Sequence, residues 1–359
     1  MITLIWIGFS QSLFVAILMF TKKESSLPDK VLSGFLTLLS IEFLTCGVDY
    51  FAYNEPLLSS SFLLFNPALY IYINSLTRSN FKLHPWQLLH LLPFIGFEIT
   101  AYLLHEPLAL ETYFFSDKQL LFRILFGIAN VVSWLVYNPL SLILVHRHRM
   151  HLRNEKSTIG TNENLSWILF VSIFYVVFCI LSVVFALLIF THTIHPLSPH
   201  FFNYSMLLVL IYVFGFYGLR QQTLSFELLN QRPATPYLHS TLTEDLKQAI
   251  AVKIKQYTEQ EKPWLHSDFN MDAFSAAVSI PKYQLTEVLN THMGFNFFQY
   301  INMYRVEAVK EMLSDPKNNY SIEAIGYECG FASKSAFYSV FKKMTQTTPV
   351  EYRALHFKT

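Results

Sequence analysis

Residues 321–343 have the sequence SIEAIGYECGFASKSAFYSVFKK and predict two short helices joined by a tight turn. Gly330 lies in the break between them, where a helix-to-helix turn needs the positive φ that glycine adopts freely. Ser333 is a favoured N-cap for the second helix. On that helix Phe337 and Phe341 are four residues apart, so we expect both to face a core. The stretch therefore predicts a helix-turn-helix unit.

A similar pair of short helices precedes this unit in the sequence. Met271–Val278 is followed by the break 279–281 and by a helix from Lys282, in which Leu285 and Leu289 are expected to be buried. A helix that enters the major groove needs an apolar side toward its own domain and hydrogen-bonding side chains on the other side. Taken alone, each pair is better explained as an ordinary pair of amphipathic surface helices.

The stretch 264–353 resembles the DNA-binding domain of the AraC/XylS family of bacterial transcription regulators. The resemblance lies in Gly294-x-x-Phe297-x-x-Tyr300, Tyr304-Arg305-x-x-Ala308, Ile322-x-x-Ile325-Gly326-x-x-x-Gly330-Phe331, Ser333-x-Ser335-x-Phe337-x-x-x-Phe341-Lys342-Lys343 and Thr348-Pro349-x-x-Tyr352-Arg353. It implies an all-α domain of seven helices, with two helix-turn-helix units joined by a long helix at about 297–313. The two recognition helices would then reach successive major-groove faces of one site.

The family pattern also implies which residues contact DNA. Base-reading positions fall on Tyr283, Thr286 and Glu287 in the first unit and on Lys334, Ser335, Tyr338 and Ser339 in the second, with Lys342, Lys343 and Arg353 near phosphates. The chain departs from the pattern at Gln346, where glycine is usual, at Pro281, where serine is usual, and at Glu287, where a basic residue is common.

The charge balance of this domain predicts weak DNA binding. Residues 264–359 contain nine basic and nine acidic side chains, whereas nucleic-acid-binding domains are typically basic. Phosphate contacts supply most non-specific affinity, so we expect an isolated domain to bind DNA weakly. A homodimer would compensate through a raised effective concentration.

The rest of the chain has the composition of a membrane protein. Of 359 residues, 52% are hydrophobic and 14% are charged, against about 25% charged residues in ordinary soluble domains. Residues 1–219 hold only 11 of the 26 basic and 11 of the 25 acidic side chains. We therefore expect a membrane domain at 1–219, a cytoplasmic connector at 220–263 and the DNA-binding domain at 264–359.

Seven apolar segments are candidates for membrane spans. They lie at about 2–20, 31–52, 59–76, 85–104, 120–145, 166–191 and 201–219. The loops on one side carry nine basic residues: Lys22, Lys23, Lys30, Arg78, Lys82, Arg147, Arg149, Arg153 and Lys156. The loops on the other side carry Lys118 and the border residue Arg123. This bias predicts an outside N-terminus and a cytoplasmic C-terminal domain at a bacterial inner membrane.

The connector contains one predicted helix. Thr241-Leu242-Thr243-Glu244 fits a capping box, and apolar residues recur at helical spacing to about Glu261, before Pro263. This apolar stripe could pack on the following domain or on a second copy of the chain.

Four ionisable residues lie inside predicted spans: Glu42, Asp49, His90 and Glu98. Such residues usually face the interior of a bundle. They are candidates for a signal-sensing site, and the alternative is that they form interhelical hydrogen bonds.

The sequence thus predicts a membrane-tethered, signal-responsive transcription regulator that binds promoter DNA. The alternatives are a transporter-like membrane part or a ligand-free tether, each with an attached DNA-binding domain. The sequence contains no HExxH, Gly-x-Ser-x-Gly or phosphate-loop motif, so we expect neither an enzyme, nor a bound metal, nor a cofactor.

Overall fold

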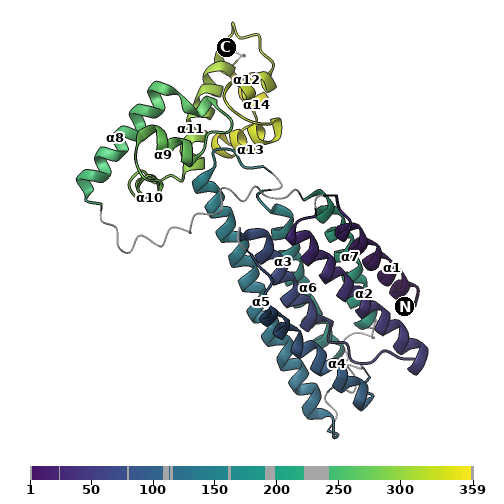
Figure 1. Ribbon diagram of the computed structural model, residues 1–359. Coiled ribbons are helices and arrows are strands. Elements are labelled where there is room, and N and C mark those ends of the chain that lie inside the picture. Colours follow the sequence, from purple (N-terminus) through teal and green to yellow (C-terminus); the bar gives the residue numbers. More distant parts are fainter. Residues whose placement is uncertain are drawn as a thin grey trace. The chain divides into compact units, whose positions relative to one another are not determined.

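The computed structural model describes residues 2–23, 25–78, 81–107, 113, 116–160, 163–190, 199–221 and 242–356 (Figure 1). These residues are mainly helical, and their β-type pairing is limited to two isolated bridges. The all-α fold predicted from the sequence is confirmed. The chain divides into two compact units: unit 1 contains Met1–His146 and Leu165–Asn230, and unit 2 contains Arg147–Asn164 and Gln231–Thr359.

Unit 1 is built from the predicted apolar segments, all of which are helical. They are α1 (Ile2–Phe20), α2 (Leu27–Tyr53), α3 (Ser61–Thr77), η1 with α4 (Pro85–Leu91 and Leu92–Leu104), α5 (Leu120–Glu155), α6 (Ser166–Phe190) and α7 (Pro199–Arg220). Over the described residues, five helices are long and apolar enough to cross a membrane: α1, α2, η1 with α4, α5 and α7. The helix α3 has 17 residues, and the described Ser166–Ser182 of α6 is apolar but shorter than a full span.

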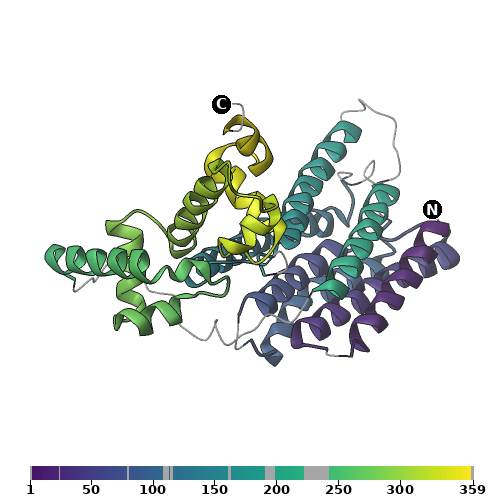
Figure 2. The ribbon, with the colours of Figure 1, turned by 90° about the horizontal axis from the view of Figure 1, so that it is seen from above.

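The first and last helices of unit 1 lie side by side. The helix α1 packs against α2 and α7, while α3 packs against α2, η1 and α4 (Figure 2). Large apolar side chains cover the outer surface, among them Phe14, Leu135 and Ile180. Buried polar groups such as Glu42 face inward. This arrangement suits a lipid environment, because lipid accepts apolar side chains and penalises charged ones.

Three prolines predicted within spans are accommodated in different ways. Pro67 and Pro139 lie inside α3 and α5, which continue past them. Pro93 lies in the first turn of α4, where the missing N–H has no intrahelical acceptor to lose. Proline therefore interrupts none of these helices.

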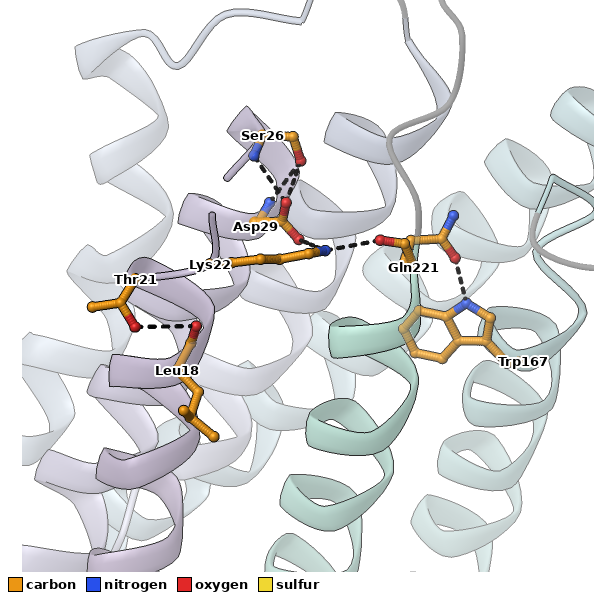
Figure 3. A network of polar contacts seen from close by, with 7 residues as sticks. All are labelled: Leu18, Thr21, Lys22, Ser26, Asp29, Trp167 and Gln221. Carbon is orange, nitrogen blue, oxygen red and sulfur yellow. Dashed lines mark hydrogen bonds and ion pairs between the residues drawn. The ribbon is translucent and has the colours of Figure 1, made fainter. Parts of the chain in front are cut away.

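One end of unit 1 is held by a polar network that joins four helices (Figure 3). Lys22 Nζ donates to Asp29 Oδ1 at 3.1 Å and to the main-chain oxygen of Gln221 at 2.8 Å. Trp167 Nε1 donates to Gln221 Oε1 at 3.0 Å. Ser26 and Asp29 form a reciprocal cap at the start of α2. Lys22 thus places a cation at the carbonyl end of α7, where the helix dipole favours positive charge.

Unit 2 contains the two helix-turn-helix units. Its helices are α8 (Glu244–Glu261), η3 (Pro263–Leu265), α9 (Met271–Val278), α10 (Lys282–Glu287), η4 (Val288–His292), α11 (Phe297–Ser314), α12 (Ile322–Glu328), α13 (Lys334–Thr345) and α14 (Pro349–His356). Residues 264–356 contain six α-helices, α9 to α14, so the expected seventh helix is not among them, and α8 lies in the predicted connector. The helix α11 confirms the predicted long joining helix. It contributes Tyr300 and Ile301 to one hydrophobic core and Val309 and Leu313 to another.

Candidate functional site

The second helix-turn-helix unit is formed by α12 and α13. Ser333 caps α13 by accepting a hydrogen bond from the N–H of Ala336 at 3.2 Å. Gly330 has a φ of +84° in the turn, as the sequence predicts. Phe337 and Phe341 are buried, which confirms the predicted core side of this helix.

The opposite side of α13 carries the predicted base-reading residues. Lys334, Ser335 and Ser339 are exposed and Tyr338 is half-buried. The Lys334 ammonium lies 5.8 Å from the centroid of the Tyr338 ring. Lys334 is also hydrogen-bonded to Glu323, which raises the pKa of the lysine. This side of α13 therefore presents a lysine ammonium, two serine hydroxyls and a tyrosine side chain to a ligand.

The residues predicted to contact phosphate differ in their exposure and in their contacts within the domain. Lys342 and Lys343 are exposed near the end of α13. Arg353, by contrast, donates to the main-chain oxygens of Asn318 and Tyr320 at 3.0 Å each. Its guanidinium thus holds the turn after α11, a role that the sequence analysis missed.

The first unit differs from expectation at two of its three predicted base-reading residues. Tyr283 is exposed at 57%, but Thr286 and Glu287 are only 7% and 4% exposed. The expectation that these two side chains point outward is wrong. The burial of Glu287 is explained by the helix α8, because Lys247 Nζ of that helix lies 3.9 Å from Glu287 Oε1.

The helix α8, predicted within the connector, packs against the first unit. It contacts α9 and η4, and Ile250 and Ile254 belong to the hydrophobic core. Its N-cap is Thr243, which accepts a hydrogen bond from the N–H of Leu246 at 3.4 Å. The predicted capping box with Thr241 as the cap is therefore wrong by two positions, and Thr241 itself lies outside the described part of the chain. The stripe packs within the chain, so polar replacement of Ile250 would disturb the core.

A buried arginine lies on the joining helix. Arg305 has no exposed surface. Its Nε donates to the main-chain oxygen of Trp264 at 2.7 Å, and its Nη2 donates to that of His266 at 2.8 Å. Burial lowers the pKa of the Arg305 guanidinium to about 10, which leaves it charged at neutral pH. The guanidinium thus ties α11 to the segment that follows α8.

The structure brings three of the four candidate sensing residues to one short segment, residues 57–60. Asp49 Oδ2 accepts from the N–H of Leu57 at 3.3 Å, and Asp49 also binds the Tyr102 hydroxyl. Glu98 Oε2 accepts from the N–H of Ser60 at 3.1 Å.

Glu42 joins the same group from α2. Its Oε1 accepts from the hydroxyls of Ser59 and of Tyr204, the latter at 3.1 Å. Its Oε2 is buried without a hydrogen-bond partner among the described residues. The three carboxylates thus connect α2 and α4 through residues 57–60, and Glu42 connects α2 to α7 through Tyr204.

The fourth candidate, His90, lies apart from this group. Its Nδ1 is 2.6 Å from the Tyr137 hydroxyl of α5, and its ring contacts those of Trp86 and Tyr137. These contacts connect η1 with α5.

Comparisons with known proteins give a family model and two similar proteins. Residues 274–355 match the family model described as a helix-turn-helix domain. The HTH-type transcriptional regulator AdiY of Escherichia coli K12 is 26% identical over 138 residues, which cover 38% of this chain and 52% of AdiY. The chain thus spans about half the length of this curated relative. The structure of a protein of unknown function from Listeria innocua is 27% identical, with a TM-score of 0.26, over 30% of this chain and 96% of that chain.

The family match and the geometry fall on the same residues. Two helix-turn-helix units, the long helix α11 between them and an outward polar side on α13 all lie within or beside residues 274–355. The C-terminal part of this chain is a helix-turn-helix domain of the AraC type, a class of DNA-binding domain.

Proposed function

We propose that the chain is a membrane-tethered, sequence-specific transcription regulator that responds to a signal through its membrane part. The observation that carries the proposal is that one chain joins an AraC-type domain to helices apolar enough to cross a bilayer. Its partners are double-stranded promoter DNA, the lipid bilayer, a second copy of the chain and an envelope or small-molecule signal. The second copy offsets the weak affinity expected of a domain without net charge.

The charge bias of the loops supports an orientation for this protein. Basic residues concentrate in the loops after α1 and α3, at the start of α2, and in the last turns of α5 with the loop after it. By the positive-inside rule these loops are cytoplasmic, so the N-terminus lies outside and the AraC-type domain faces the cytoplasm. The membrane is then the inner membrane of a bacterium.

In this proposal the second helix-turn-helix unit makes more of the contacts to base edges than the first unit does. Four predicted base-reading side chains are accessible on α13, whereas only Tyr283 is clearly exposed among those of the first unit. Lysine, serine and tyrosine can each donate hydrogen bonds to base edges or phosphates.

We expect a Lys334→Ala, Tyr338→Ala double variant to lose promoter enrichment about tenfold or more, since each lost base contact costs about 1–3 kcal/mol. The measurement is genome-wide recovery of DNA with the full-length protein in its native membrane. The matched control is Lys317→Ala, Tyr320→Ala, which removes the same two residue types from an exposed turn of the same domain. Equal enrichment by the wild type and the Lys334→Ala, Tyr338→Ala variant would overturn the proposed recognition face.

The proposed sensing site is the set of three carboxylates around residues 57–60, which belong to Glu42, Asp49 and Glu98. A ligand changes DNA binding only if it prefers one arrangement of the helices, and these carboxylates connect three of them. We expect Glu42→Gln with Glu98→Gln to shift basal expression of a target promoter at least threefold, because a 0.7 kcal/mol bias suffices for about that change. Exposed Glu55→Gln is the control for loss of an acidic charge. A passive tether, the second candidate, predicts the same reporter activity in all of these variants at equal protein levels.

A further inference from the structure

A short segment at the end of α5 belongs to unit 2 and docks on the first helix-turn-helix unit. This docking segment comprises Glu155, Lys156, Ser157 and Thr158. Lys156 forms an isolated bridge with Asn270, the N-cap residue of α9. The Ser157 hydroxyl donates to the main-chain oxygen of Phe269.

The docking segment supplies most of the hydrogen bonds of the buried Arg305. Arg305 Nη1 donates to the main-chain oxygen of Ser157 at 3.1 Å and to Thr158 Oγ1 at 3.0 Å. Its Nη2 donates to Ser157 Oγ at 3.1 Å. Asn302, one turn earlier on α11, donates to the main-chain oxygen of Ser157 at 2.8 Å. The joining helix thus has a specific receptor site for this segment.

The segment also engages the first residue of the first recognition helix. Glu155 Oε2 lies 3.2 Å from the ammonium of Lys282, and both side chains are largely buried. Asp272 contacts the same ammonium. The carboxylates of Glu155 and Asp272 therefore neutralise the Lys282 ammonium, and Lys282 is followed in the chain by the exposed Tyr283. A cation at the start of a recognition helix is well placed to contact phosphate, and here it is already paired.

These contacts suit an interaction that can be made and broken. All four residues of the docking segment are polar, and their contacts with α9, α10 and α11 described above are hydrogen bonds and one ion pair. Water can replace such partners, whereas it cannot replace a buried apolar anchor. The segment continues directly from α5, which is unbroken from Leu120 to Glu155. A shift of α5 in the membrane therefore acts on the docking segment without an intervening loop.

We propose that the docking segment is an internal ligand of the AraC-type domain, which holds it in a state of reduced DNA affinity until a movement of α5 releases it. This inference rests on the function proposed above. Release withdraws the carboxylate of Glu155 from the start of α10 and leaves Lys282 paired with Asp272 alone. The start of α10 thereby loses one negative charge, which favours contact between Lys282 and a phosphate.

The test uses the full-length protein in lipid nanodiscs and a fluorescein-labelled DNA duplex of random sequence. Glu155→Gln should bind this duplex about three- to tenfold more tightly than the wild type, with a salt slope steeper by about one phosphate contact. Ser157→Ala with Thr158→Ala should also tighten binding, although it changes no charge. The matched control is Asp268→Asn, which removes an exposed acidic charge from the same unit and should change affinity less than twofold.

Hydrogen exchange provides a readout of docking that does not depend on DNA. Amides of residues 155–158 and 269–270 should exchange faster in both docking-segment variants than in the wild type. Faster exchange with unchanged DNA affinity would show that the segment docks without regulating, which overturns the proposal. Equal gains in Glu155→Gln and Asp268→Asn would assign the effect to net charge and would also overturn it. Failure of every protein to bind DNA would instead refute the proposed function itself.

Discussion

Replacement of Arg305 by methionine is expected to unfold the C-terminal domain. The guanidinium donates five hydrogen bonds, to the main-chain oxygens of Trp264, His266 and Ser157 and to the hydroxyls of Ser157 and Thr158. Methionine fills a similar volume but satisfies none of these acceptors. Each buried polar group left without a partner costs about 1–3 kcal/mol. The main-chain oxygens of Trp264 and His266 belong to the domain itself, so the loss of their hydrogen bonds alone removes a large part of the stability of a typical domain, about 5–15 kcal/mol, whether or not the docking segment is bound.

The measurement is hydrogen exchange and limited trypsin digestion of residues 242–356 in the full-length protein. Lys310→Met is the matched control, because Lys310 lies on the same helix and pairs only with the neighbouring Glu307 among the described contacts. Its removal should cost less than about 1 kcal/mol. Arg305→Lys should give an intermediate result, since lysine keeps the charge without the planar fork. Wild-type protection in Arg305→Met would show that these hydrogen bonds contribute little.

Substitution of Gly330 by alanine should disrupt the second helix-turn-helix unit. Gly330 has a φ of +84°, and a Cβ there would lie 2.2 Å from the main-chain oxygen of Trp264 and 2.8 Å from that of Leu265. Neither oxygen belongs to a side chain that could rotate away. The left-handed conformation alone costs about 1–2 kcal/mol for a residue with a Cβ. The clash adds to this cost, so we expect a loss of more than about 3 kcal/mol.

Gly294 provides a control that separates the clash from the backbone conformation. Its φ is +77°, but a Cβ at this position would have no neighbour within 4 Å. Gly294→Ala should therefore lose only the conformational part, about 1–2 kcal/mol. Denaturant titration of the full-length protein, followed by hydrogen exchange in residues 321–345, compares the two variants. A similar loss of unfolding free energy in both variants would mean that the main chain around Gly330 shifts to make room for the added methyl group.

The hydropathy and turn chemistry of the sequence were enough to predict most of the fold. Apolar runs located the helices of unit 1, and Gly330, Ser333 and the spacing of Phe337 and Phe341 located the second helix-turn-helix unit. These signals are local, because each depends on residues within one or two turns of helix.

The parts of the candidate site that depend on distant contacts could not be predicted. Glu287 appeared to be an outward residue of its own helix, but Lys247 of α8 lies beside it. Arg305 binds residues nearly 150 positions earlier in the chain, and no local pattern marks that pairing. Similarly, the spans contained Glu42 and Glu98 as isolated acidic residues, and only the folded chain brings both to the segment that contains Ser59 and Ser60.

The polar network at Lys22 has a consequence for how the protein is made. Lys22 and its acceptor Gln221 are separated by 199 positions, although α1 and α7 pack against each other. Chains emerge from the ribosome with the N-terminus first, so Lys22 is synthesised long before its acceptor. The last helix of unit 1 therefore completes the surroundings of the first. Because residues 242–356 are translated after Gln221, the helices of the membrane part can assemble before the DNA-binding domain exists.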